Sequence, residues 1–399
     1  MARLAGLSSA HTIADLRELA RRRLPRAIYE FVERGTEDDL LIRQNRAAIE
    51  RIKFAPRVLR DVSLRDQSID LFGRRQPTPL VIAPTGIADL LCHRGETAIA
   101  RAAAQAGIPF TLVTSSTTSI EEISPIVTPT GFWMQLYLWE RRDLSWQLIE
   151  RAGAAGAEVL VLTVDTPILP LREFNKRNGM SNPIRPNPTL ALDFARHPRW
   201  SLAVLGRYLL TGGLPQFANY PREIGTKITG VVSRQANSAS VTWADVTELR
   251  RRWPGKLVLK GVLTREDALL AREHGVDGLA VSNHGGRNFD SSPAAIDVLP
   301  EIVDAVGTDL TVLFDGGVRR GADVAKALAI GAKAVLLGRA TLFGAAAGGE
   351  AGATRALDIL KNEIDVAMAM LGVTTLDQLD RSDLRPETLS DRQAATASA

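Results

Sequence analysis

Cysteine is almost absent from the sequence: Cys92 stands alone, so no disulfide can form within the chain. We expect a reducing compartment, because structural disulfides belong mainly to oxidising ones. No apolar run approaches the ~20 residues that a membrane-spanning helix needs, and no uninterrupted apolar leader precedes Arg17. A cytoplasmic location is therefore predicted, with peripheral attachment to the inner face of a membrane left open.

Long runs of one charge are also missing. The 49 Lys and Arg residues are scattered among 45 Asp and Glu residues, and the formal net charge is +4. Such scattering does not favour nucleic acid binding, which needs a sustained basic surface. The five histidines have no metal-ligand spacing, and no GxGxxG motif follows the first predicted strand. A metal site and a dinucleotide-binding fold are therefore disfavoured.

What the sequence does contain is a regular alternation of short apolar runs with helical segments. Most runs are nearly continuous in Val, Ile, Leu and Phe, which is typical of parallel strands covered on both faces. Several of the Ala-rich helical segments between them end at a glycine. Eight such units predict a (β/α)8 TIM barrel. The predicted strands are residues 79–84, 109–114, 131–137, 159–165, 256–261, 278–283, 311–316 and 334–339.

Three further segments accompany the barrel, which is expected over residues 79–384. Residues 1–78 are expected to form short helices followed by a small hairpin. The interval after the fourth strand is too long for one helix, so an insertion over about residues 173–245 is predicted. We interpret it as a lid over the active site, with a membrane or partner contact as the alternative. Residues 385–399, rich in Ala, Ser and Thr, are expected to be disordered.

The candidate catalytic residues follow the carboxyl ends of predicted strands, where barrel enzymes carry their reacting groups. Among the histidines only His284 follows a strand directly, and the two glycines after it allow close approach of a ligand. Asp165 ends an apolar strand and needs a partner, because burying an unpaired carboxylate is costly. The imidazole of His284 is its natural partner, and a helix cap is the alternative role.

A phosphate site is predicted at the last two strands, where barrels often bind phosphate. Glycines there allow close approach of the backbone, and arginines supply positive charge. This pattern indicates a phosphorylated cofactor or substrate. Lys260, at the end of the fifth strand, is either a Schiff-base former of a lyase or aldolase or a fixed cation beside an anionic cofactor. The glycines and arginines of the pattern are Gly316, Gly317, Gly321, Gly338, Arg319 and Arg339.

Three strings of residues resemble the FMN-dependent family that oxidises 2-hydroxy acids, which includes lactate dehydrogenases, glycolate oxidases and mandelate dehydrogenases. The strings are Ser-Asn-His-Gly-Gly-Arg at 282–287, Asp-Gly-Gly-Val-Arg-Arg-Gly at 315–321 and Leu-Thr-Val-Asp-Thr-Pro at 162–167. The resemblance runs from about Leu24 to Leu384. It implies FMN as cofactor, oxidation of an L-2-hydroxy acid to the 2-oxo acid, a homotetramer, and oxygen or a quinone as electron acceptor.

The same resemblance implies a role for each matching residue. His284 would take the proton from the substrate, and Asp165 would support the imidazolium that forms. Lys260 would lie near N1 of the flavin and stabilise the reduced ring, which removes the need for a Schiff base. Contacts with the substrate are implied for Tyr137, Arg172 and Arg287. Contacts with FMN are implied for Pro84, Thr85, Gly86, Gln135, Thr163, Ser282, Asp315, Gly316, Gly317, Arg319, Gly338 and Arg339.

Two positions depart from the family pattern. Phe31 stands where the family has a tyrosine that binds the substrate carboxylate, and this loss removes a contact of ~1–3 kcal/mol. Val113 stands where a hydroxyl normally reaches the flavin. Both changes make the pocket more apolar, so we expect a larger or aromatic, mandelate-like hydroxy acid in preference to lactate. An amine or a modified peptide is the alternative substrate.

Overall fold

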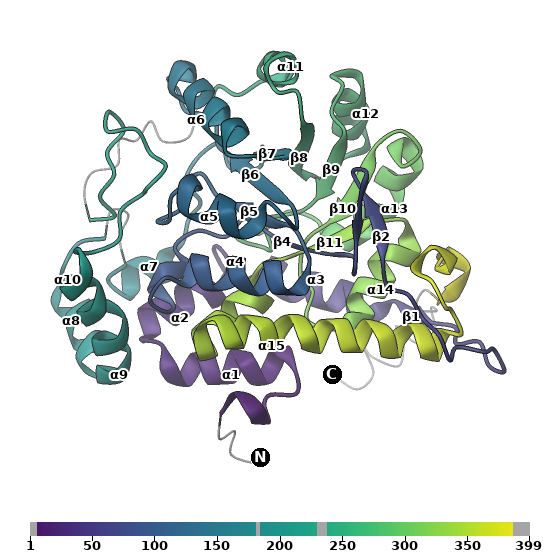
Figure 1. Ribbon diagram of the computed structural model, residues 1–399, viewed down its shortest axis with the longest axis horizontal. Coiled ribbons are helices and arrows are strands. Elements are labelled where there is room, and N and C mark those ends of the chain that lie inside the picture. The colour runs from purple at the N-terminus through teal and green to yellow at the C-terminus, as the bar shows by residue number, and fades with distance from the viewer. Residues whose placement is uncertain (1–5, 181–183, 230–237, 386–399) are drawn as a thin grey trace.

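The core of the molecule is a closed parallel barrel in which each strand pairs with the next one along the chain (Figure 1). The computed structural model describes residues 6–180, 184–229 and 238–385. The last strand closes the barrel on the first, with Leu336 opposite Val81. All eight predicted strands are present, so the predicted TIM barrel is confirmed. The strands are β4 (Leu80–Ile82), β5 (Phe110–Leu112), β6 (Phe132–Leu136), β7 (Val159–Thr163), β8 (Lys256–Val262), β9 (Gly278–Val281), β10 (Thr311–Phe314) and β11 (Ala334–Leu337).

Helices cover the outside of the barrel and bury their apolar faces against it. Several of them begin at a residue whose side chain caps the helix. For example, the Thr264 hydroxyl accepts a hydrogen bond from the Asp267 amide at 3.2 Å. The last helix is the longest, and a kink at Gly348 and Gly349 divides it. The helices are α4 (Gly95–Ala106), α5 (Ile120–Val127), α6 (Arg142–Ala154), α11 (Trp243–Arg252), α12 (Arg265–Glu273), α13 (Ala295–Val306), α14 (Gly321–Ile330) and α15 (Arg339–Leu371).

The N-terminal region brings three helices and a hairpin to the barrel. In Figure 1 the first helix lies along α15. The third is held to the His284 loop by a reciprocal amide pair, in which the Asn45 and Asn283 side chains donate to each other at 3.0 and 2.8 Å. The helices are α1 (Ile13–Arg23), α2 (Arg26–Glu33) and α3 (Leu40–Arg51), and the strands are β1 (Lys53–Phe54), β2 (Ile69–Leu71) and β3 (Arg74–Gln76), β1 pairing with β12 (Leu384–Arg385).

The insertion between β7 and β8 contributes a group of short helices at one side of the molecule (Figure 1). The Asp193 carboxylate attaches this group to α2 by accepting hydrogen bonds from the amides of Arg26 and Ala27, at 3.1 and 2.8 Å. Its role as a lid stays a prediction. Its helices are α7 (Glu173–Arg177), α8 (Pro188–Ala195), α9 (Pro198–Ser201), the π-helix η3 (Leu202–Gly206) and α10 (Arg207–Thr211).

Parts of three predicted segments lie outside the described residues, including residues 1–5 of the N-terminal segment. The other parts are residues 181–183 and 230–237 of the insertion and residues 386–399 of the predicted disordered tail. Over the described part of the chain, no helix has both the length and the apolar character that crossing a bilayer requires. The remaining single-turn helices are η1 (Leu7–Ser9), η2 (Ala88–Leu90), η5 (Leu376–Gln378) and η6 (Arg381–Asp383).

Candidate active site

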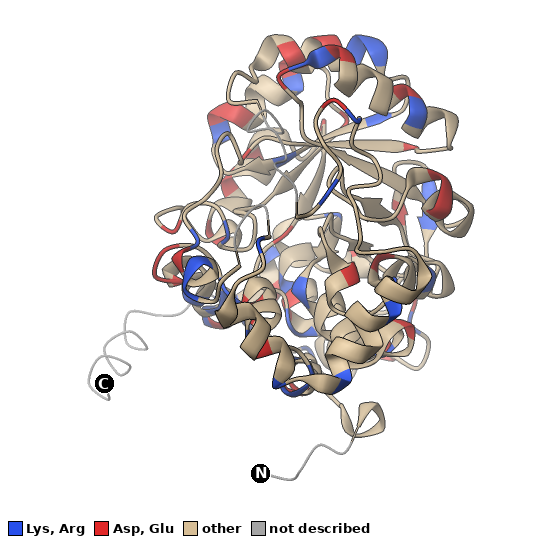
Figure 2. Cartoon of the chain, turned by 90° about the vertical axis from the view of Figure 1, so that its left-hand side faces the viewer, with Lys and Arg blue, Asp and Glu red and all other residues tan. Residues whose placement is uncertain are grey.

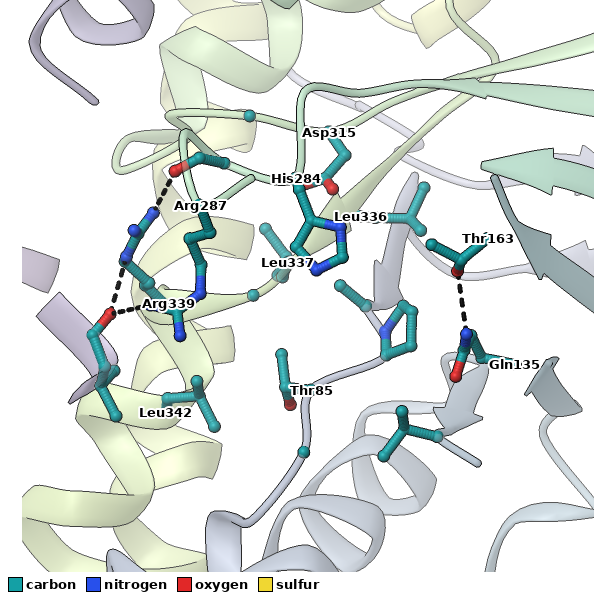
Figure 3. Close-up of a pocket in the computed structure, with 18 of the residues that line it drawn as sticks. Thr85, Gln135, Thr163, His284, Arg287, Asp315, Leu336, Leu337, Arg339 and Leu342 are labelled. Atoms are coloured by element: carbon teal, nitrogen blue, oxygen red, sulfur yellow. Dashed lines mark hydrogen bonds between the residues drawn. The ribbon is translucent and has the colours of Figure 1, made fainter. Parts of the chain in front are cut away.

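A pocket opens at the carboxyl ends of the barrel strands, where the sequence placed the candidate residues (Figure 3). Most of the predicted site residues line it. Asp165 and Ser282 do not, but they are hydrogen-bonded to residues that do. Gly321 of the predicted phosphate pattern does not line it either, and its amide donates to the Glu363 carboxylate at 2.7 Å. The predicted residues in the lining are Phe31, Pro84, Thr85, Gly86, Gln135, Tyr137, Thr163, Arg172, Lys260, His284, Arg287, Asp315, Gly316, Gly317, Arg319, Gly338 and Arg339.

The sequence analysis missed much of the apolar wall of the pocket. An apolar residue beside a strand has the same sequence signal whether it lines a pocket or the core, so the pattern could not separate the two. Val113, noted as a departure from the family, lies in this wall together with Ser115. The other lining residues that were not predicted are Val32, Ala83, Ile87, Leu91, Gly285, Val318, Leu336, Leu337 and Leu342.

His284 and Asp165 form a hydrogen-bonded pair at the mouth of the barrel. Nδ1 of His284 lies 3.0 Å from Oδ1 of Asp165. An ionised carboxylate can only accept, so Nδ1 carries the hydrogen and Nε2 keeps its lone pair. Figure 3 shows the His284 ring between Arg287 and Arg339 on one side and Gln135 and Thr163 on the other.

The surroundings of this pair keep the histidine neutral and the aspartate charged. Burial lowers the pKa of His284 below its ordinary value, although the Asp165 charge opposes this change. Burial raises the pKa of Asp165, but the charge and hydrogen bond of His284, with the charge of Lys260, outweigh it and give a net lowering. A neutral imidazole with a free Nε2 is the form that can take up a proton at neutral pH.

The backbone of His284 is held in an unusual conformation. Its φ of +57° lies in the left-handed region, which residues other than glycine seldom adopt. The Ser282 hydroxyl oxygen accepts a hydrogen bond from the His284 amide at 3.1 Å. Strained backbone of this kind persists where the surroundings enforce it, and it concentrates at functional sites.

Lys260 is a buried cation with an acidic partner. Its Nζ lies 2.7 Å from Oδ2 of Asp315 and donates to the Ser282 hydroxyl at 2.8 Å. Burial lowers the pKa of Lys260, but Asp315 and Asp165 raise it more, so the net change is upward. A Schiff-base former must be neutral to attack a carbonyl. The geometry therefore favours a fixed cation and does not favour the lyase alternative.

Four arginine side chains around the pocket lack an acidic partner. Among the residues that the structure describes, no carboxylate lies within ion-pair distance of any of them. Burial lowers the pKa of Arg172 to about 10 and that of Arg319 to about 9, which leaves both charged at neutral pH. Buried positive charge without a partner is costly, so it indicates that the pocket binds anions. The four are Arg172, Arg287, Arg319 and Arg339.

Two of these arginines attach the end of α2 to the pocket. Nη1 of Arg287 donates to the carbonyl oxygens of Phe31 and Arg34, both at 2.8 Å. Nε of Arg339 donates to the carbonyl oxygen of Val32 at 2.9 Å. The last carbonyls of a helix have no partner within it and carry partial negative charge, so they attract guanidinium groups. This contact is why Phe31 and Val32, far away in the sequence, line the pocket.

The predicted phosphate loop follows β10. Gly317 has a φ of +81°, and a Cβ there would lie 3.1 Å from Cβ of Asn45, so the position suits glycine alone. The Asp323 carboxylate at the start of α14 accepts hydrogen bonds from the amides of Arg319 and Arg320, at 2.8 and 3.0 Å. These contacts hold the loop in a conformation in which Gly316, Gly317 and Arg319 line the pocket, and this lining suits an anionic ligand.

Comparison with known proteins agrees with this geometry. A model of the family described as FMN-dependent dehydrogenase matches residues 20–386. A putative L-lactate dehydrogenase of Mycobacterium tuberculosis is 41% identical over 94% of this chain and 88% of its own length. The (S)-mandelate dehydrogenase of Pseudomonas putida is 39% identical over 94% of each chain, and an L-lactate oxidase of Nostoc is 39% identical over 96% of this chain and 100% of its own.

Solved structures agree as well. A monotopic membrane protein, (S)-mandelate dehydrogenase, superposes with a TM-score of 0.89 at 38% identity, covering 95% of this chain and 100% of its own. A mandelate oxidase with (S)-2-phenylpropionate superposes with a TM-score of 0.79 at 35% identity, covering 94% and 98%. The barrel, the pocket chemistry and the match over nearly the whole chain lead to one conclusion. The chain belongs to the FMN-dependent dehydrogenase family.

Proposed function

We propose that this chain uses FMN to oxidise an L-2-hydroxy acid to the 2-oxo acid. The observation that carries the proposal is that a neutral histidine, paired with Asp165, lines the same pocket as Arg172 and Arg287. A base and a pair of cations are what a 2-hydroxy acid requires, because its hydroxyl and carboxylate lie on adjacent carbons. FMN supplies the acceptor for the two electrons that the substrate loses.

Residues of the chain take up the substrate proton and bind the substrate. His284 takes up a proton from the substrate at Nε2, and Asp165 stabilises the imidazolium that forms. Arg172 and Arg287 bind the carboxylate and orient the substrate. Tyr137, at the end of β6, contacts a substrate oxygen. Each role is one that charge and geometry permit, since all four pocket residues line one cavity.

The proposed FMN site uses other residues of the same pocket. Lys260, fixed by Asp315, would supply a positive charge that stabilises the negatively charged reduced form of FMN. The phosphate has two negative charges to match Arg319 and Arg339 and the open Gly316 and Gly317 loop. The ring would lie along the remaining proposed contacts, which are Pro84, Thr85, Gly86, Gln135, Thr163 and Ser282, with Gly338 at the phosphate.

The substrate that we propose has a large apolar or aromatic side chain. Phe31 offers no hydroxyl to the pocket, and Val113, Ile87 and Leu91 add apolar surface to its wall. Burying the side chain of such an acid gains ~25 cal/mol per Å² of apolar surface, a gain that a methyl group cannot match. The named relatives are hydroxy acid enzymes, so the alternative of an amine or modified peptide substrate finds no support among them.

Anaerobic reduction of the flavin tests both statements. The purified yellow protein is expected to bleach with L-2-hydroxy acids and not with their D isomers, and mandelate should give a higher kcat/KM than lactate. Phe31→Tyr should raise kcat/KM for lactate roughly five- to tenfold, because it restores one hydrogen bond to a charged group. Phe54→Tyr in β1 is the matched control. A colourless protein that refuses FMN would refute the function, and faster turnover of lactate would refute the substrate preference.

We also propose that the insertion attaches the protein to a membrane surface. Several leucines of α8, η3 and α10 are exposed, Leu210 at 89% and Leu202 at 75%. Arg199 in α9 and Arg207 in α10 are exposed as well. The helices of the insertion lie on the side of the molecule that Figure 2 turns to the viewer. Exposed leucines with nearby arginines suit the interface of a bilayer with anionic lipids. The structurally similar mandelate dehydrogenase is described as a monotopic membrane protein.

Vesicle sedimentation checks this attachment. The wild type is expected to sediment with vesicles that contain anionic lipid, and replacing both Leu209 and Leu210 by Asp should abolish most of that binding. Val58 and Leu59 are equally exposed but lie far from the insertion in sequence, so their double Asp variant is the control. Equal sedimentation of all three proteins would contradict the proposal. Membrane attachment favours a lipid-soluble quinone over oxygen as electron acceptor, and the homotetramer stays a prediction.

A further inference from the structure

The insertion contacts the backbone of a segment that forms part of the pocket wall. After β4 the chain lines the pocket with Pro84, Thr85, Gly86 and Ile87 and then turns through η2 towards α4. We call residues 87–94 the pocket turn. Leu91, inside this turn, lines the pocket as well. The position of the pocket turn therefore determines the position of this wall of the pocket.

The pocket turn is strained at both ends. Ile87 has a φ of +62° and Arg94 a φ of +57°, both in the left-handed region. A β-branched residue there is a true outlier, and it persists only when the surroundings enforce it. The turn is also tightly packed, since a Cβ on Gly95 would lie 2.1 Å from the carbonyl oxygen of Ala88. Other contacts must hold this conformation in place.

Two side chains of the insertion supply such contacts. Nε1 of Trp200 in α9 donates to the carbonyl oxygen of Leu90 at 3.0 Å. The hydroxyl oxygen of Tyr208 in α10 accepts a hydrogen bond from the Arg94 amide at 2.8 Å. Both side chains are buried. One hydrogen bond therefore reaches the middle of the pocket turn, and the other reaches its strained end.

Tyr208 makes a further contact with the pocket turn besides this hydrogen bond. Its ring packs on the His93 ring with centroids 4.6 Å apart. Burial and the nearby Asp89 raise the pKa of Tyr208, so the hydroxyl keeps its proton. A single residue of the insertion thus contacts two positions of the pocket turn, Arg94 and His93.

We propose that Trp200 and Tyr208 are positioning residues that hold the pocket turn and so set the wall of the pocket against the flavin. The inference rests on the proposed function, because it requires FMN in the pocket. A merely structural role would change the stability of the protein and leave the properties of the bound flavin unaltered. A positioning role changes FMN affinity and the flavin spectrum in a protein that is still folded.

The test compares hydroxyl and indole variants of the FMN-loaded enzyme. Tyr208→Phe keeps the ring on His93 and is expected to weaken FMN binding roughly three- to tenfold, since one hydrogen bond is lost, and to shift the flavin absorption bands. Trp200→Phe should act in the same direction and serves as the second variant if the first is poorly folded. Tyr29→Phe and Trp243→Phe, which remove the same groups elsewhere, should leave FMN affinity unchanged.

Ile87→Gly provides the decisive background. Combined with Arg94→Gly, it relieves both strained ends, because glycine adopts a positive φ without strain, so the turn no longer needs the insertion to enforce it. In that background Tyr208→Phe is expected to change FMN affinity less than twofold, and the difference between the two backgrounds measures the coupling. Folded variants with the FMN affinity and spectrum of the wild type would overturn the inference, as would an equal effect in both backgrounds. A wild type that never binds FMN would instead refute the proposed function, and this inference with it.

Discussion

Replacing His284 by Asn is expected to lower kcat roughly 10²–10⁴-fold, the usual contribution of a positioned base, while FMN remains bound. Asparagine preserves a polar side chain and can still contact Asp165, but it has no lone pair basic enough to take the substrate proton. Stopped-flow reduction of the flavin by a hydroxy acid measures this step directly. Intact FMN absorption would show that the loss is chemical and does not arise from an empty pocket.

His274 offers a matched control for this variant. It stacks on Trp243, with ring centroids 5.1 Å apart, and lies outside the pocket. His274→Asn should keep the wild-type rate of flavin reduction. If His284→Asn reduced its flavin within tenfold of the wild-type rate, the proposed role of His284 would be wrong.

Replacing Arg287 by Met should remove about 2–5 kcal/mol of transition-state stabilisation, or roughly 30- to 4,000-fold in kcat/KM. Methionine approximates the length of the side chain but offers no charge to the substrate carboxylate. Arg287→Lys restores the charge without the planar pair of donors, so we expect it to recover only part of the loss. Steady-state kinetics with one hydroxy acid across the three proteins check this order.

Arg287 also has a structural role, so this prediction needs two controls. Its bonds to the carbonyls of Phe31 and Arg34 hold the end of α2, so FMN content and thermal unfolding must be compared across the variants. Arg252, which packs over the Trp146 ring away from the pocket, provides Arg252→Met as a reference. A kcat/KM for Arg287→Met within threefold of the wild type would contradict carboxylate binding by this residue.

Much of the fold could be predicted because its signals are local. Each barrel strand is covered on both faces, so it needs an unbroken apolar run, and that run is visible in the sequence as at Val159–Thr163. Polar residues that follow such runs were easy to identify for the same reason. His284 and Asp165 were placed together on this argument, and the structure brings their side chains to 3.0 Å. Their catalytic roles stay predictions.

Contacts between distant segments could not be predicted in the same way. Ile87 and Leu91 have the apolar pattern of core residues, and only the left-handed turn at Ile87 brings them to the pocket. The bonds from Arg287 and Arg339 to the end of α2 join residues more than two hundred positions apart. The residues near the arginine do not indicate the helix end that it binds, and those near the helix end do not indicate the arginine. Every helix ends in unpaired carbonyls, so their sequence carries no information about the donor.

The amino-acid sequence by itself determined the barrel, the order of its strands and the kinds of chemical group at its mouth. These follow from apolar periodicity and from the residue types that come after each strand, both of which act over a few neighbouring positions. Only the tertiary structure decided which apolar side chains form the pocket wall, which carbonyls the unpaired arginines bind, and that Trp200 and Tyr208 contact the pocket turn. The physical reason is that these contacts depend on how whole elements pack, and packing is set by the chain as a whole.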